Sequence, residues 1–213
     1  LLNPTYSTVV LGQPLEAAAT ANRLQQAAAL PLLVAADFEF GLGMRITGAT
    51  TFPRAMAFGA AGDEALAREA GRIIGIEARA IGVHVNFAPV ADVNNNARIP
   101  VINTRSFGED PQRVAALAVA YARGLREGGA LATVKHFPGH GDTDVDSHLG
   151  LPVITHPRER LDAMELVPFR AAIADGVDAL MTGHIELPAF DPTPGTPATL
   201  SRPTVTGFLR NEL

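Results

Sequence analysis

The sequence predicts an α/β fold with a parallel sheet, arranged as a (β/α)8 barrel. Four short apolar runs rich in branched residues lack strict alternation, which is typical of parallel strands covered on both faces. A helical pattern precedes each run, and this unit repeats at a spacing of roughly 50 residues, which indicates a parallel sheet. Polar residues follow the carboxyl ends of these runs, as they do on the functional face of a barrel.

The predicted elements alternate along the chain. Strands are expected at 31–37, 83–92, 132–137 and 178–185, and helices at 15–29, 63–81, 111–127 and 165–175, with another beginning at about residue 203. Asp110 followed by Pro111 marks a helix start, because an aspartate cap and a proline in the first turn both favour one. The periodicity predicts two buried helix faces, formed by Leu66, Ala70, Ile73, Ile74 and Ile81 and by Val114, Leu117, Ala118, Tyr121 and Leu125.

The position of the polar residues decides between a barrel and an open, doubly wound sheet. They lie at or just past the ends of successive strands: Asp37, Asp92, Lys135, His136, His184 and Glu186. A doubly wound sheet would concentrate function at one switch point, and no glycine-rich nucleotide-binding motif follows any strand. Because a complete barrel needs about 250 residues and eight strands, residues 1–213 are expected to form a single domain that is the central portion of a barrel. Its first strand would precede residue 1, and further strands would follow residue 213.

Composition excludes several classes of protein. The chain has 213 residues, of which 47% are hydrophobic, and a net charge of −5, which suits a soluble domain with a sizeable core. No apolar stretch is long enough to span a membrane, and the lack of basic runs argues against a nucleic-acid partner. The absence of cysteine excludes disulfides and thiolate metal sites. The cellular compartment is left open by the sequence.

The polar segment KHFPGHGDTDVDSH, residues 135–148, admits three kinds of site. A metal site would use side chains among His136, His140, Asp142, Asp144, Asp146 and His148. Pro138, Gly139 and Gly141 prevent a helix here, so the two histidines four residues apart need not face one another. A phosphate-binding loop is disfavoured, since the aspartates would repel the anion.

Acid/base chemistry is the third kind of site. In Asp146-Ser147-His148, an extended backbone places the carboxylate and the imidazole on one side, where the carboxylate orients the ring for proton transfer. Lys135 is the only lysine among 17 basic residues, which indicates a position that needs a compact ammonium rather than a guanidinium.

Five motifs in this order resemble glycoside hydrolase family 3, and specifically its NagZ-like β-N-acetylglucosaminidase branch. They are VAADFEFG at 34–41, NFAPVADVN at 86–94, RSFGEDP at 105–111, KHFPGHGDTDVDSHLGLP at 135–152 and MTGHIELP at 181–188. The β-glucosidase branch of the family is less similar, because it lacks the Asp-x-His element.

The resemblance implies a role for eight residues. Asp37, Arg105, Lys135 and His136 would bind the hydroxyls of a terminal sugar, and Met181 and His184 would line the site. His148 would be the catalytic acid/base and Asp146 its orienting partner, with no metal and no cofactor. Taken singly, each residue has a structural alternative. Asp37 would cap the following turn, Arg105 would pair with Glu109 or Asp110, and His184 would be a core histidine.

The implied activity is that of a retaining β-N-acetylhexosaminidase. Its partner would be a saccharide containing N-acetylglucosamine (GlcNAc), derived from peptidoglycan or chitin. The family's nucleophilic aspartate is expected after a segment like TVTGFLRNEL at 204–213, so none is assigned in this chain. Two kinds of alternative remain: a phosphorylase or β-glucosidase of the same family, and a non-catalytic sugar-binding protein.

Overall fold

A four-stranded parallel sheet forms the centre of the protein. The computed structural model describes residues 2–3, 8–9, 12–96, 101–143 and 150–213. The sheet order is β3 (Ala35–Ala36), β4 (Val85–Asn86), β5 (Leu131–Phe137) and β6 (Ala179–Thr182), the same as the order in sequence. Each strand therefore pairs with the next one along the chain, as in a (β/α)8 barrel, whereas a doubly wound sheet reverses direction. The predicted barrel architecture is confirmed.

Three of the predicted strands, at 31–37, 83–92 and 178–185, are longer than the strands β3, β4 and β6 that the structure contains. The regular pairing of β4 stops before Pro89, which has no backbone N–H to donate to a ladder. The segment nevertheless continues beside β5, because the N–H groups of Thr133 and Lys135 bond to the carbonyls of Ala88 and Pro89. The predicted extents therefore describe extended chain, of which only a part is regular strand.

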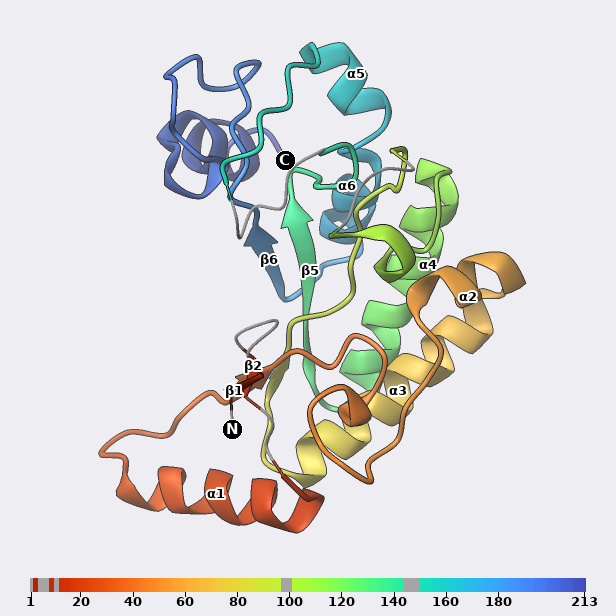
Figure 1. The fold of residues 1–213 in the computed structure, drawn as a ribbon, viewed down its shortest axis with the longest axis vertical. Helices are drawn as coiled ribbons and strands as arrows, with labels where there is room; N and C mark the ends of the chain where they lie inside the picture. The colour runs from red at the N-terminus through yellow and green to blue at the C-terminus, as the bar shows by residue number, and fades with distance from the viewer. Residues whose placement is uncertain (1, 4–7, 10–11, 97–100, 144–149) are drawn as a thin grey trace.

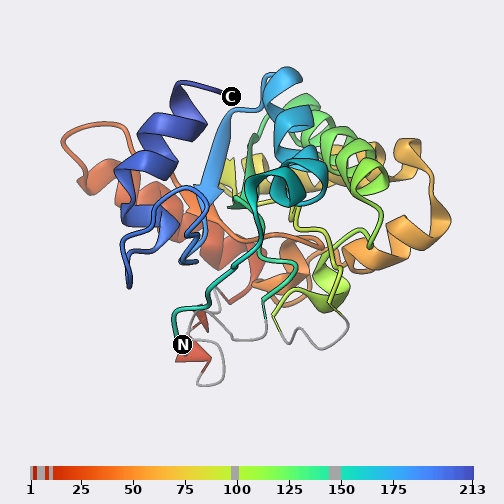
Figure 2. The ribbon, with the colours of Figure 1, turned by 90° about the horizontal axis from the view of Figure 1, so that it is seen from above.

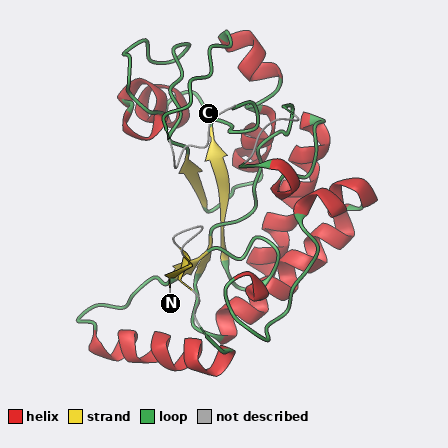
Figure 3. Ribbon diagram, viewed as in Figure 1, coloured by secondary structure: helices red, strands yellow, loops and turns green. Residues whose placement is uncertain are grey.

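Helices lie outside the strands (Figures 1 and 3). They are α1 (Pro14–Ala27), α2 (Ala55–Ala61), α3 (Glu64–Ala80), α4 (Pro111–Glu127), α5 (Arg158–Ala163), α6 (Val167–Ala174) and the π-helical η4 (Pro203–Arg210). Three short 3-10 turns are η1 (Leu42–Met44), η2 (Asn103–Arg105) and η3 (Ala198–Leu200), and a small antiparallel pair joins β1 (Leu2–Asn3) to β2 (Thr8–Val9). The sequence pattern did not indicate α2 or α5. In Figures 1 and 2, α3 and α4 lie on one side of β5 and β6, and η4 lies on the other.

The start and the buried face of α4 agree with the sequence prediction. The Asp110 carboxylate accepts a hydrogen bond from the Arg113 backbone N–H at 2.8 Å, and Pro111 occupies the first turn. All five predicted core residues of this helix are buried. The apolar ring of Tyr121 is among them, and its hydroxyl reaches the segment that follows β3.

The predicted buried face of α3 is correct only in part. Ala70, Ile74 and Ile81 are buried, but Ile73 is only partly buried and Leu66 is 52% exposed. The face that packs against α4 is instead made of small residues, namely Ala67, Ala70, Gly71, Gly75 and Ala78, together with Ile74. A Cβ at Gly71 would overlap the Tyr121 carbonyl oxygen, so the two backbones are in direct contact. At Gly71 and Gly75 the backbone of α4 is so close that no side chain fits there.

The core is continuous on both sides of β5. The Phe137 ring packs edge-on against Phe169 of α6, with 5.5 Å between ring centroids, and stacks on Phe208 of η4 at 6.2 Å. The successive residues 132–135 of β5 are also all buried, so this strand is covered on both faces, as its lack of strict alternation predicts. Within the described ranges, no helix has both the length and the apolar composition required to cross a membrane.

The close approach of α3 and α4 predicts the effect of enlarging one glycine. In Gly124→Ala, the added methyl group would overlap the backbone carbonyl of Arg68, which cannot rotate away. We expect the free energy of unfolding to fall by about 1–3 kcal/mol, as for other overpacked interiors, measured by urea denaturation. The matched control is Gly207→Ala in η4, where no atom lies nearer than 3.9 Å. That variant should be neutral or slightly more stable, and equal stability of Gly124→Ala and wild type would contradict the packing account.

Candidate active site

The carboxyl ends of β3, β4 and β5 bring charged side chains into one cluster. The Lys135 Nζ lies 2.8 Å from Asp37 Oδ1 and 2.8 Å from Glu39 Oε1. The lysine side chain is only 3% exposed, whereas that of Asp37 is 37% exposed. The ammonium is therefore buried between two carboxylates, one of which is accessible to solvent. Asp37 does not serve simply as a cap for the following turn.

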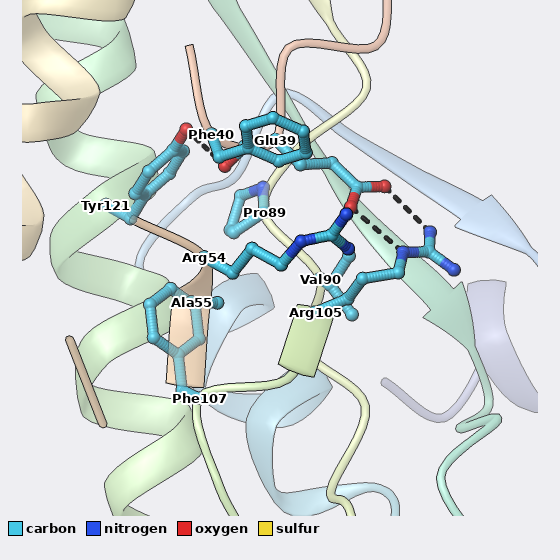
Figure 4. Close-up of a pocket in the computed structure, with 9 residues that line it drawn as sticks. All are labelled: Glu39, Phe40, Arg54, Ala55, Pro89, Val90, Arg105, Phe107 and Tyr121. Carbon is cyan, nitrogen blue, oxygen red and sulfur yellow. Dashed lines mark hydrogen bonds and ion pairs between the residues drawn. The ribbon is translucent and has the colours of Figure 1, made fainter. Parts of the chain in front are cut away.

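Glu39 is a member of the cluster that the sequence interpretation did not include. Its carboxylate accepts hydrogen bonds from Arg105 Nε at 2.9 Å and Arg105 Nη2 at 2.7 Å (Figure 4). Arg105, at the end of η2, therefore pairs across the site rather than with the neighbouring Glu109 or Asp110. The motif VAADFEFG contained a signal for Glu39. Glu39 follows Asp37 by two residues, and residues two apart in an extended segment point to the same side.

The charged state of Glu39 is strongly favoured. Burial acts to raise the pKa of its carboxyl, but the hydrogen bonds and charges of Arg105 and Lys135 outweigh burial and hold the pKa well below its usual range. Burial acts to lower the pKa of Arg105, and the contact with Glu39 more than compensates and raises it. Both partners are therefore ionised throughout the physiological pH range.

Asp92 organises a second part of the cluster. Its fully buried carboxylate accepts hydrogen bonds from the backbone N–H of His136 at 3.2 Å and of His140 at 2.6 Å, and its Oδ2 lies 2.7 Å from His136 Nδ1. The Ser106 hydroxyl donates to the Asp92 backbone carbonyl at 2.6 Å. Burial acts to raise the pKa of Asp92, but its contacts with His136 and His140 lower it overall. An ionised Asp92 places the His136 proton on Nδ1 and leaves Nε2 as an acceptor.

The segment after β5 is held by specific contacts as far as residue 143. A Cβ at Gly141 would overlap the Val93 carbonyl, so the backbones touch there. The Thr143 hydroxyl lies 2.6 Å from His140 Nδ1, and Asp142 Oδ2 lies 2.6 Å from His156 Nε2. His140 and Asp142, two candidates for the metal alternative, thus contact different partners. Among the described residues no three His, Asp or Glu side chains converge in a way that would hold a metal.

The remaining candidate residues fall into two groups. Asp146 and His148, and Asp144 of the metal alternative, lie outside the described residues. Met181 of β6 is paired with Lys135 in the strand ladder and is partly buried. His184 follows β6 and is exposed, so the alternative of a core histidine is wrong. Asp37, Arg105, Lys135 and His136 are thus brought together, with Met181 beside them.

A small pocket adjoins Glu39 and Arg105 (Figure 4). Its other lining residues are Phe40, Arg54, Ala55, Pro89, Val90, Phe107 and Tyr121. The Tyr121 hydroxyl lies 3.1 Å from the Glu39 carbonyl oxygen, to which it donates, and burial raises the pKa of this hydroxyl so that it stays protonated. The helix α4 therefore supports the backbone that presents Glu39.

The contact with Asp92 predicts the tautomer and the titration of His136. Burial lowers the pKa of His136, and the opposing attraction of Asp92 does not restore it. We expect a neutral ring protonated on Nδ1, with a pKa below the ordinary value of about 6.5, measured by 15N–1H correlation spectra of the imidazoles. Because the unfolded chain binds this proton first, His136 should reduce stability as the pH falls below about 6.5.

His84 is the internal control for this measurement. Its Nδ1 accepts a hydrogen bond from the Val34 backbone N–H at 3.2 Å, so its proton belongs on Nε2. Burial lowers the pKa of His84 as well. The two histidines should therefore show opposite tautomers in one spectrum. An Nε2-protonated His136 would contradict the role given to Asp92.

Comparison with known proteins identifies the family. The model of the glycosyl hydrolase family 3 N terminal domain matches residues 2–213. Beta-hexosaminidase A of Pseudoalteromonas piscicida is 40% identical over 225 residues, which cover 98% of this chain and 37% of that protein. A glycoside hydrolase family 3 beta-N-acetylglucosaminidase from Paenibacillus sp. str. FPU-7 has a TM-score of 0.91 at 51% identity, over 95% of this chain and 39% of that chain.

A structure of another activity is also similar. Beta-glucoside phosphorylase BglX bound to 2FGlc has a TM-score of 0.89 at 32% identity, over 93% of this chain and 38% of that chain. This chain thus spans less than two fifths of the length of each of these three proteins. The resemblance found in the sequence motifs is confirmed, and the chain belongs to glycoside hydrolase family 3, where it matches the N-terminal domain.

Proposed function

We propose that this chain is part of a retaining β-N-acetylhexosaminidase that releases terminal β-linked GlcNAc from fragments of peptidoglycan or chitin. The observation that carries the proposal is the Asp37–Lys135–Glu39–Arg105 cluster at the carboxyl ends of the strands. Buried ion pairs carry a large desolvation penalty and add little to stability. Clusters of such charges are common at active sites, where they bind a ligand. The 51% identity to a β-N-acetylglucosaminidase supports the choice of sugar.

The cluster offers the hydrogen bonds that a sugar requires. Vicinal hydroxyls both donate and accept, so a site for them needs acceptors and donors side by side. Asp37 presents a partly exposed carboxylate as acceptor, and Lys135 beside it has donors. His136 adds the Nε2 acceptor that Asp92 leaves unprotonated. Charge-assisted hydrogen bonds of this kind are stronger and more directional than neutral ones.

The proposed reaction is a double displacement. A carboxylate attacks the anomeric carbon while an acid protonates the leaving oxygen, and water then releases the sugar from the enzyme. In this proposal His148 is the acid in the first step and the base in the second, and Asp146 orients it. The nucleophilic carboxylate is not assigned to any residue of this chain.

A phosphorylase is the second candidate, favoured by the likeness to the β-glucoside phosphorylase. A neutral histidine base repels an incoming phosphate less than a carboxylate does. For the protein that carries this chain, we expect hydrolysis of an aryl β-GlcNAc substrate, with free GlcNAc formed at the same rate with and without phosphate. GlcNAc 1-phosphate formed in the presence of phosphate would establish the phosphorylase instead. Turnover of the aryl β-glucoside alone would identify a β-glucosidase, and binding without turnover a sugar-binding protein.

The acid role of His148 predicts a dependence on the leaving group. In His148→Ala, glycosylation by natural saccharides should slow by about 10²–10⁴, the usual contribution of general acid catalysis. Aryl glycosides with good leaving groups need little protonation and should be slowed much less in this step. The measurement is the pre-steady-state release of the aglycone for a series of substrates. Equal slowing across the series would contradict an acid role for His148.

A further inference from the structure

We propose that Glu39 is a positioning residue that balances the charges of Arg105 and Lys135 and so makes the sugar site selective for neutral over anionic sugars. The inference rests on the proposed function and adds to it a determinant of selectivity. Three features of Glu39 support it: the cation contacts of both carboxylate oxygens, the donors that these contacts leave free, and the charge that Glu39 offsets.

Both oxygens of the Glu39 carboxylate contact cations. One oxygen, Oε1, accepts from Arg105 Nη2 at 2.7 Å and lies 2.8 Å from Lys135 Nζ, while Oε2 accepts from Arg105 Nε at 2.9 Å. The side chain is only 8% exposed. Because its oxygens are already engaged and it is buried, Glu39 acts on a sugar through the two cations rather than by contact.

These contacts determine which donors remain for a ligand. Arg105 has five N–H donors, of which one each from Nε, Nη1 and Nη2 is engaged by Glu39 and the Val101 carbonyl. Lys135 has three, of which two face Asp37 and Glu39. Among the described residues, two donors of Arg105 and one of Lys135 therefore remain available. The contacts with Glu39 fix the direction in which these remaining N–H groups point.

The same contacts balance the charge of the cluster. The ion-paired cations are Arg45, Arg105 and Lys135, and the anions are Asp37, Glu39 and Asp92, while Arg54 lines the adjoining pocket. His136 adds no charge in its neutral form. A neutral sugar is bound by such a cluster through hydrogen bonds alone. A sugar carboxylate meets Arg105 and Lys135 with their charge already offset by Glu39, and it is repelled by the accessible Asp37, so these contacts disfavour it.

The decisive variant is Glu39→Gln, which keeps the size of the side chain and removes its charge. The probes are GlcNAc and its C6-carboxylate analogue, 2-acetamido-2-deoxyglucuronic acid, which differ in charge but share the ring. We expect the Kd ratio of the anionic to the neutral sugar to fall by about tenfold in this variant, because one cation is left unbalanced. The shift should shrink at high salt. Titration calorimetry on protein carrying this chain measures both constants.

Two further variants separate selectivity from structural damage. Glu39→Gln combined with Arg105→Gln removes one charge of each sign, so the Kd ratio should return toward the wild-type value even if both affinities fall. The single variant leaves Arg105 as a buried cation without its carboxylate and is therefore at risk of folding poorly. The double variant avoids this unpaired charge. The control is Glu127→Gln, which removes an equivalent bidentate contact with Arg68 on the exposed helix layer and should leave the ratio unchanged.

The outcomes distinguish this inference from the proposed function. A wild-type protein that neither binds GlcNAc nor turns over its aryl glycoside overturns both. Wild-type binding together with an unchanged Kd ratio in Glu39→Gln overturns the inference and leaves the proposed function intact. An equal loss of affinity for the two sugars shows a merely structural role and also overturns it. If the single variant does not fold, the double variant alone tests the inference. A Kd ratio in the folded double variant that differs clearly from the wild-type ratio then overturns it.

Discussion

The buried ammonium of Lys135 is the constraint on which the site depends. A charge taken out of water is stable only when paired and hydrogen-bonded, and removal of its partners would leave it uncompensated. Its partners, Asp37 and Glu39, follow β3, which is separated from β5 by β4 in the sheet. The ion pair between Lys135 and Asp37 therefore spans 98 residues of sequence and fixes the end of β3 relative to β5, across the intervening β4.

β4 completes this arrangement from between the other two strands. Asp92, just beyond it, accepts hydrogen bonds from two backbone N–H groups of the segment after β5 and contacts the ring of His136. The Asp92 carboxylate thus fixes both the orientation of the His136 imidazole and the path of the backbone toward His140. Gly141 adds a further contact between these two segments, because its backbone touches the Val93 carbonyl and leaves no room for a side chain. Lys135 and His136 are consequently presented on a rigid base, as precise ligand binding requires.

Much of this arrangement followed from the sequence pattern, and the exceptions have physical reasons. The strand order and the position of Asp37, Lys135 and His136 were predictable, because parallel strands place their carboxyl ends together. The exposure of Leu66 was not, because hydrophobic periodicity overlooks a face made of glycine and alanine. Glu39 was missed although it follows Asp37 by two residues, because its contacts with Arg105 and Lys135 arise only when the strand ends meet. The positions of Asp146 and His148, outside the described residues, remain a prediction from the sequence.

The difference between Lys135 and Arg105 explains why the chain needs its one lysine at this position. An ammonium is a compact charge that serves two carboxylates from different directions, as Lys135 does with Asp37 and Glu39. A guanidinium is a planar fork suited to one carboxylate, as Arg105 is in its paired contact with Glu39. An arginine in place of Lys135 would need space for the fork in a position that is already buried, and a lysine in place of Arg105 would lose one of the two parallel hydrogen bonds. The two cations are therefore not interchangeable, although they share an anion.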